Sequence, residues 1–221
     1  MDVKQRKWIQ WALAPIVALV IALGWRYPWM GFSVPFVMLM GIIGGMIRGR
    51  YVCGNLCPRG AFFDRLLSRV SPRRPIPTSF RNGVLRGVIL VLLMGVMAFR
   101  VYQNPTSVTH WGRVFWMMCV VTTAVGIGFG LVWHYRSWCA FCPMGTIQSL
   151  LGGRRKALRI SAERCIECRR CEKVCPMNLP IVSHKAQGVV EEPDCLRCSE
   201  CVAVCPRQAL FWPGPLPQRD V

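Results

Sequence analysis

Eight of the thirteen cysteines form two copies of one pattern. The first copy is Cys165-x2-Cys168-x2-Cys171-x3-Cys175-Pro176, and the second, 30 residues later, is Cys195-x2-Cys198-x2-Cys201-x3-Cys205-Pro206. This is the bacterial run that binds [4Fe–4S] clusters, in which the fourth cysteine of each run ligates the other cluster. The spacing therefore predicts two [4Fe–4S] clusters.

The exchange of the fourth cysteine defines the two expected ligand sets. One cluster is expected on Cys165, Cys168, Cys171 and Cys205, and the other on Cys195, Cys198, Cys201 and Cys175. Structural zinc and disulfides are the alternatives for repeated cysteine pairs. Duplicated four-cysteine runs that both end in proline favour iron–sulfur clusters, and an expected cytoplasmic location disfavours disulfides.

Four further cysteines lie in two pairs that each precede a Pro-x-Gly sequence. The segments read CGNLCPRGAFFDRLLSR from Cys53 and CAFCPMGTIQSLLGGR from Cys139, which indicates a weak internal repeat. If the two copies pack together, Cys53, Cys57, Cys139 and Cys142 can supply four thiolates to one centre. We therefore expect a third metal centre, most simply iron–sulfur. Redox-active dithiols or structural turns are the alternative, and the isolated Cys119 is left out of the site.

The elements that must position these cysteines are apolar. The chain is 53% hydrophobic with a mean hydropathy of +0.34. Runs at 8–25, 27–47 and 114–135 contain no Asp, Glu, Lys or Arg, and each approaches the roughly 20 residues that cross a bilayer. A shorter apolar run predicts one more span at about 82–102, the third of four in chain order, with Arg86 and Arg100 reaching towards lipid headgroups. A buried or re-entrant helix is the alternative for this run.

The 221 residues carry 28 Lys+Arg, 10 Asp+Glu and a formal net charge of +18. Most basic residues of the membrane half lie at the N-terminus, between the second and third spans, and after the fourth span. Positively charged loops remain in the cytoplasm, so both termini are expected there. Because the charge marks topology and no nucleic-acid-binding signature is present, nucleic acid is not an expected partner.

Other chemistry-bearing residues are few. His134, at the cytoplasmic end of the fourth span, can hydrogen-bond a quinone carbonyl or lie among lipid headgroups. No histidine lies deep in a span, which disfavours haem. Arg48 and Arg50, just before Cys53, can stabilise an anionic cluster or anchor the second span. No nucleotide or flavin motif is present, and no residue is assigned a catalytic role.

The fold class that follows is an α-helical membrane protein. Residues 1–153 are predicted to form a transmembrane domain of four helices arranged as two hairpin repeats, with two cytoplasmic Cys-Pro motifs. Residues 154–221 are predicted to form an α+β ferredoxin domain with two [4Fe–4S] clusters.

Four spans, a Cys-x3-Cys-Pro motif after the second, a similar pair after the fourth and a C-terminal two-cluster run resemble the NapH/NosR-type ferredoxin membrane proteins. The resemblance covers residues 8–210, but the pair Cys139-x2-Cys142 is one residue shorter than the family pattern. It implies a redox subunit of a quinol dehydrogenase-type complex, rather than a stand-alone enzyme, in the inner membrane of a bacterium.

The expected function is electron transfer between the quinone pool and a partner redox protein in a respiratory chain. An assembly factor that supplies electrons for metal or thiol reduction, or a redox-sensing regulator, is the alternative. The sequence leaves open the direction of electron flow, the terminal acceptor, the quinone site, the type of the interfacial centre and the oligomeric state.

Overall fold

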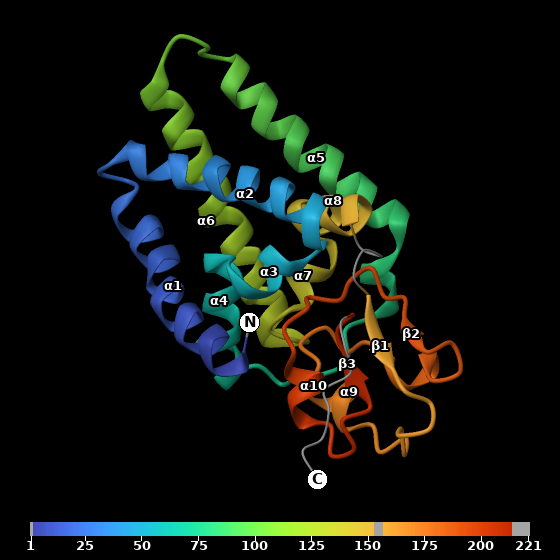
Figure 1. The fold of residues 1–221 in the computed structure, drawn as a ribbon. Coiled ribbons are helices and arrows are strands. Elements are labelled where there is room, and N and C mark those ends of the chain that lie inside the picture. Colours follow the sequence, from blue (N-terminus) through green and yellow to red (C-terminus); the bar gives the residue numbers. More distant parts are fainter. Residues whose placement is uncertain (1, 153–156, 214–221) are drawn as a thin grey trace.

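The computed structural model describes residues 2–152 and 157–213. Four long helices dominate it (Figure 1), namely α1 (Val3–Leu23), α2 (Ser33–Arg48) with the preceding 3-10 turn η1 (Pro28–Phe32), α5 (Gly83–Tyr102) and α6 (Val108–Val132). All four are long and apolar enough to cross a membrane. Four membrane-spanning candidates were predicted at nearly these positions, and the structure is compatible with a multi-pass membrane protein.

The helix ends differ from the predicted spans because polar caps, rather than apolar runs, set them. The predicted start of the first span was residue 8, but α1 begins at Val3, where Asp2 and Gln5 form a capping box. The predicted start of the fourth span was residue 114, but α6 begins at Val108, where the Ser107 side chain accepts a hydrogen bond from the His110 N–H. Caps extend a helix beyond the apolar stretch that hydropathy detects.

A pair of short helices follows α2, and a second pair follows α6. The first pair is α3 (Tyr51–Asn55) and α4 (Pro58–Arg65), and the second is α7 (Ser137–Phe141) and α8 (Pro143–Gly152). Pro58 and Pro143 are the first residues of α4 and α8, where the missing N–H costs nothing and the fixed φ favours the helix. The backbones of Cys57 and Cys142 are not helical, so each Cys-Pro step separates two short helices. The segment between α4 and α5 holds the 3-10 turns η2 (Leu67–Arg69) and η3 (Thr78–Arg81).

The C-terminal part combines a small sheet with short helices. Three strands pair antiparallel in the order β2 (Val189–Val190), β1 (Leu158–Ile160) and β3 (Leu210–Phe211). The helical elements are α9 (Arg170–Lys173), η4 (Val182–His184) and α10 (Glu200–Val204). Leu158, Ile160 and Met177 are fully buried and form a core together with the cysteines. The predicted domain boundary at 153–154 lies outside the described residues.

The C-terminal part lies at one end of the long helices, beside α3 and near the described N-terminus (Figure 1). The start of α1 reaches it through Arg6, whose guanidinium contacts Glu200 at 2.8 Å. The start of α5 reaches it through Arg86, which pairs with Asp194. The prediction that Arg86 extends to lipid headgroups is therefore wrong. A buried carboxylate from the C-terminal part neutralises its charge inside the protein.

Candidate metal centres

Three cavities in the structure are lined by groups of cysteines. Cys165, Cys168, Cys171 and Cys205 line the first, which we call the Cys165 cavity. Cys175, Cys195, Cys198 and Cys201 line the second, the Cys195 cavity. Cys53, Cys57, Cys139 and Cys142 line the third, the membrane cavity, together with Cys119. The members of each predicted ligand set thus line one cavity, with the fourth cysteine of each run in the other run's cavity.

The two C-terminal motifs have the same backbone conformation. Glu167 and Arg169 in the first loop have φ of 56° and 53°, and Arg197 and Ser199 in the second have 54° and 60°. Left-handed residues at matching positions give both loops the same turns between their first three cysteines, although non-glycine residues adopt this conformation at a cost. The backbone of the two motifs is therefore repeated as well as their cysteine spacing.

The cysteines form no disulfides among the described residues, and burial disfavours the charged form of several of them. Burial raises the pKa of Cys175 to about 11 and that of Cys195 to about 12, and it also raises the pKa of Cys53 and Cys139. Thiolates bind metals, so each site releases protons when a metal ion enters. Four sulfur donors in one cavity are the donor set of iron–sulfur clusters and of structural zinc, so the residue types fit such a group.

Two buried arginines connect the cysteine pairs of the membrane cavity. Arg50 precedes Cys53 by three residues and is 1% exposed, and its guanidinium donates to the carbonyl oxygen of Cys139. Arg136 precedes Cys139 by three residues, is fully buried, and donates to the carbonyl oxygen of Cys53 at 3.1 Å. Its Nη1 also lies 3.5 Å from the Cys139 Sγ. Each arginine therefore stabilises the cysteine pair of the other segment.

The glycine of each Cys-Pro-x-Gly motif leaves room for the arginine of the other segment. A methyl group on Gly60 would lie 2.9 Å from the Cys53 carbonyl oxygen and 3.0 Å from the Arg136 Nη1. A methyl group on Gly145 would lie 3.0 Å from the Cys139 carbonyl oxygen and would overlap the Arg50 guanidinium. Both glycines are thus required by close packing against an arginine, not by a left-handed backbone.

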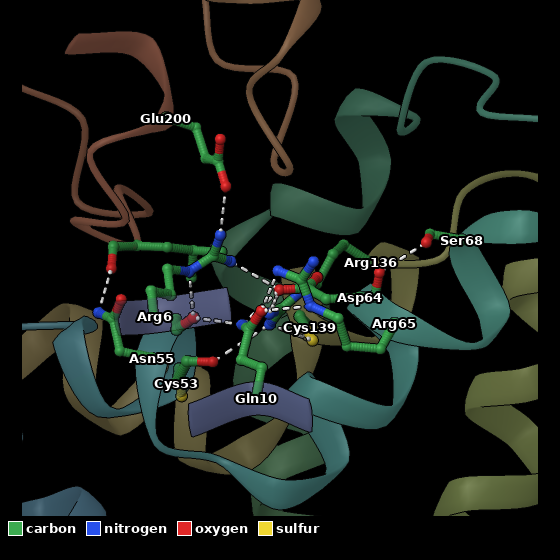
Figure 2. Close-up of polar contacts among 12 residues, drawn as sticks. Arg6, Gln10, Cys53, Asn55, Asp64, Arg65, Ser68, Arg136, Cys139 and Glu200 are labelled. Atoms are coloured by element: carbon green, nitrogen blue, oxygen red, sulfur yellow. Dashed lines mark hydrogen bonds and ion pairs between the residues drawn. The ribbon is translucent and has the colours of Figure 1, made fainter. Parts of the chain in front are cut away.

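Two buried carboxylates balance these arginines. Asp64 of α4 accepts hydrogen bonds from Arg136 at 2.7 Å, Arg6 at 2.6 Å and Gln10 at 2.7 Å (Figure 2). Burial alone would raise the pKa of Asp64, but the Arg136 and Arg6 guanidiniums hold it below its usual value. Asp64 thus joins α1, α4 and the segment that begins α7.

Asp194 has the corresponding role at the other arginine. This residue directly precedes Cys195, and it accepts from Arg50 at 2.8 Å, Arg86 at 3.0 Å and Ser149 at 3.0 Å. Its partners come from the end of α2, from α5 and from α8. The Asp194 carboxylate therefore connects the second C-terminal motif to the arginine that contacts the membrane cavity.

The membrane cavity and the Cys195 cavity are joined by direct backbone packing. Gly54, next to Cys53, lies against Leu196, next to Cys195, and a methyl group on Gly54 would overlap the Leu196 carbonyl oxygen. Asn55 donates from its amide to the same oxygen at 3.4 Å. The contact between Gly54 and Leu196 therefore lies one residue from Cys53 of the membrane cavity and one residue from Cys195 of the Cys195 cavity.

Sequence reasoning missed some of these residues and misplaced another. Asp64 is one of two acidic residues in the membrane half, a rarity that could have marked it as a buried partner for arginine. Cys119, left out of the predicted site, lines the membrane cavity. His134 does not line it. Its ring stacks on Tyr135, its Nδ1 accepts from the Arg136 N–H at 3.2 Å, and burial lowers its pKa to about 4.

Comparisons with known proteins support iron–sulfur binding. A family described as a 4Fe-4S dicluster domain matches residues 164–210, and one described as a 4Fe-4S binding domain matches residues 30–77 and 108–161. The latter segments contain both cysteine pairs of the membrane cavity. No solved structure matches.

Three curated proteins show distant similarity. The methylamine utilization ferredoxin-type protein MauN of Methylorubrum extorquens is 27% identical over 59% of this chain and 48% of its own length. Two uncharacterized proteins of Methanocaldococcus jannaschii are 24% and 25% identical, over 65% and 62% of this chain and 58% and 62% of their own lengths. The chain thus spans about half to three fifths of these relatives. Together, the two 4Fe-4S domain matches and the ferredoxin-type relative support a membrane-type ferredoxin family for this chain.

Proposed function

We propose that this chain is a membrane-bound iron–sulfur electron-transfer subunit that passes electrons between the quinone pool and a partner redox protein. The observation that carries the proposal is the contact between Gly54 and Leu196, which joins the membrane cavity to the Cys195 cavity. The Cys195 and Cys165 cavities are in turn joined by the exchanged cysteines Cys175 and Cys205. Three adjacent redox centres form a path from the membrane to the exposed Cys168. When bound, the clusters supply one-electron transfer, and the protein positions them.

We further propose that Cys53, Cys57, Cys139 and Cys142 hold a third iron–sulfur centre. Their cavity has a volume of about 190 Å³ and is also lined by the guanidinium-bearing residues Arg50, Arg59 and Arg136, whereas no carboxylate of the described residues lines it. Asp194 and Asp64 balance Arg50 and Arg136, but Arg59 makes no ion pair with any described residue, and an unbalanced buried cation favours an anionic occupant. A four-thiolate iron–sulfur centre is such an anion. The reciprocal arginines support the related proposal that the membrane half consists of two hairpin repeats.

The iron content of the purified protein tests the third centre. We expect about twelve iron atoms per chain with three [4Fe–4S] clusters, or about ten if the membrane centre is [2Fe–2S]. Cys53→Ser and Cys139→Ser should each lower the content to about eight, because each removes one ligand of this centre only. Cys119→Ser is the matched control and should change nothing. About eight atoms in the wild-type protein would refute the centre.

Quinol reduction in membranes tests the proposed pathway. Quinol should reduce the clusters promptly, and a quinone-site inhibitor should block the reduction. Clusters that quinol does not reduce, but that reduce a bound metal ion, would instead favour a role as an assembly factor.

We also propose a bacterial inner-membrane location with both termini in the cytoplasm. Exposed basic residues at the start of α1, at the end of α2 and in or after η2 support this orientation, namely Lys4, Lys7, Arg48, Arg69, Arg73 and Arg74. Four other arginines do not support the orientation, because the buried carboxylates Asp64 and Asp194 neutralise them inside the protein, namely Arg6, Arg50, Arg86 and Arg136.

An epitope inserted after Asn104, between α5 and α6, tests the orientation in intact cells. It should be accessible from the periplasm after the outer membrane is permeabilised. An epitope at the C-terminus should become accessible only after lysis. The reverse pattern would contradict the proposed topology.

A further inference from the structure

The membrane cavity extends far beyond its cysteines. Its wall includes residues from all four long helices, among them Val20 of α1, Ser33 and Val37 of α2, Met97 of α5 and Thr122 of α6. Ser33 is the first residue of α2 and Arg48 the last, so they lie about 22 Å apart along the helix. One continuous space therefore runs from the cysteines into the apolar interior of the four-helix bundle.

Arg59 breaks the symmetry of this cavity. It occupies the x position of the first Cys-Pro-x-Gly motif, where the second motif has Met144, and both residues line the cavity. The Arg59 Nη2 lies 3.6 Å from the Cys119 Sγ, while its buried Nε has no hydrogen-bond partner among the described residues. Unlike Arg50 and Arg136, it makes no ion pair with any residue that the structure describes.

A second unpaired donor belongs to the same cavity. The Trp138 side chain is 5% exposed, and its Nε1 has no hydrogen-bond partner within the described residues. The Arg50 Nε, in the same cavity, also has no partner among the described residues. A buried donor without an acceptor costs about 1–3 kcal/mol, so three of them in one cavity indicate an absent acceptor. A ligand with acceptor oxygens and an apolar body would satisfy such donors and match the apolar wall of the cavity.

We propose that the membrane cavity binds the head group of a lipid-soluble quinone, with a carbonyl oxygen at Arg59 and the apolar side of the ring and tail among α1, α2, α5 and α6. The inference rests on the proposed function and assigns its quinone site. A quinone combines acceptor oxygens with an apolar ring, and within the described part of the chain no carboxylate lines the cavity to repel these oxygens. The site lies against the cysteines, where an electron carrier would need to be.

Binding of a decyl-substituted benzoquinone to the purified, iron-loaded protein tests the site directly. Arg59→Met, which introduces the residue found in the second motif, should weaken binding about 10- to 100-fold, as expected for a lost hydrogen bond from a charged donor. Val37→Phe should also weaken binding, because it fills the cavity far from the cysteines. Met117→Leu is the control, because Met117 is exposed and does not line the cavity, and it should bind like the wild type. Iron content should stay at the wild-type level in all three.

The outcomes separate this site from the wider proposal. Wild-type affinity in both Arg59→Met and Val37→Phe would overturn the site, even if quinol still reduces the clusters, and the electron-transfer role would then stand with quinone bound elsewhere. If Arg59→Met loses iron, its change in quinone affinity has a second cause, and the affinity of Val37→Phe alone then tests the site. Probe binding that excess phospholipid abolishes would show a lipid-chain cavity and would also overturn the site.

Discussion

Replacing Asp64 with asparagine is expected to lower the free energy of unfolding by about 3–5 kcal/mol, because it leaves Arg6 and Arg136 buried without their carboxylate. The Asp64 side chain is 5% exposed and accepts hydrogen bonds from both guanidiniums. Removing one partner of a buried pair costs more than the pair contributes, since the remaining charges stay desolvated. Unfolding of wild-type and Asp64→Asn protein in the same detergent measures the difference.

Asp2→Asn is the matched control for Asp64→Asn. Asp2 is the other acidic residue of the membrane half, but it is exposed and asparagine also caps helices well, so this variant should unfold like the wild type. A small effect of Asp64→Asn, similar to that of Asp2→Asn, would show that the Arg6 and Arg136 charges are neutralised in another way.

The pH dependence of the difference follows from the lowered pKa of Asp64. A carboxyl group whose pKa is lower in the folded state stabilises the protein above its unfolded pKa, and the effect is lost as the pH falls through the folded value. Asp64 therefore stays ionised near neutrality. The difference between wild type and Asp64→Asn should be constant between about pH 6 and pH 8.

Substituting the motif glycines should remove the membrane centre while sparing the two C-terminal clusters. Gly145→Ala forces a methyl group into the Arg50 guanidinium and against the Cys139 carbonyl oxygen. Overpacking costs about 1–3 kcal/mol and displaces the arginine that holds the opposite cysteine pair. We expect the iron content of Gly145→Ala to fall from about twelve to about eight atoms per chain.

The glycine series contains its own controls. Gly60→Ala should have a smaller effect than Gly145→Ala, because its nearest contacts, at 2.9 and 3.0 Å, are less severe. Gly95→Ala and Gly128→Ala should keep full iron content, because a methyl group at either position meets no atom within 4 Å. Equal iron loss in all four variants would indicate general destabilisation of the helices, and no loss in Gly145→Ala would refute the role of Arg50 contact in the centre.

The sequence alone predicts those features that depend on the spacing of nearby residues or on the length of an apolar run. Cysteine spacing predicted the groups of four that line the two C-terminal cavities, because the loops between the first three cysteines of each run are local, and the internal repeat predicted the four that line the membrane cavity with Cys119. Apolar run length predicted four spans, because crossing a bilayer requires a minimum helix length whatever the helix packs against. The helix starts at Val3 and Val108 were missed, since one capping side chain decides each of them.

Only the tertiary structure shows which of the charged side chains are buried inside the protein. In the sequence, Arg50, Arg86 and Arg136 resemble the other basic residues near span ends, and only the fold brings Asp194 and Asp64 to them from 72 to 144 positions away. The reciprocal contacts have no sequence signal beyond the motif glycines and the position of each arginine three residues before its cysteine. Desolvation makes such pairing obligatory for a buried arginine, but its partner is set by how the helices pack. The sequence thus determined which thiols assemble, and the fold determined the charges around them.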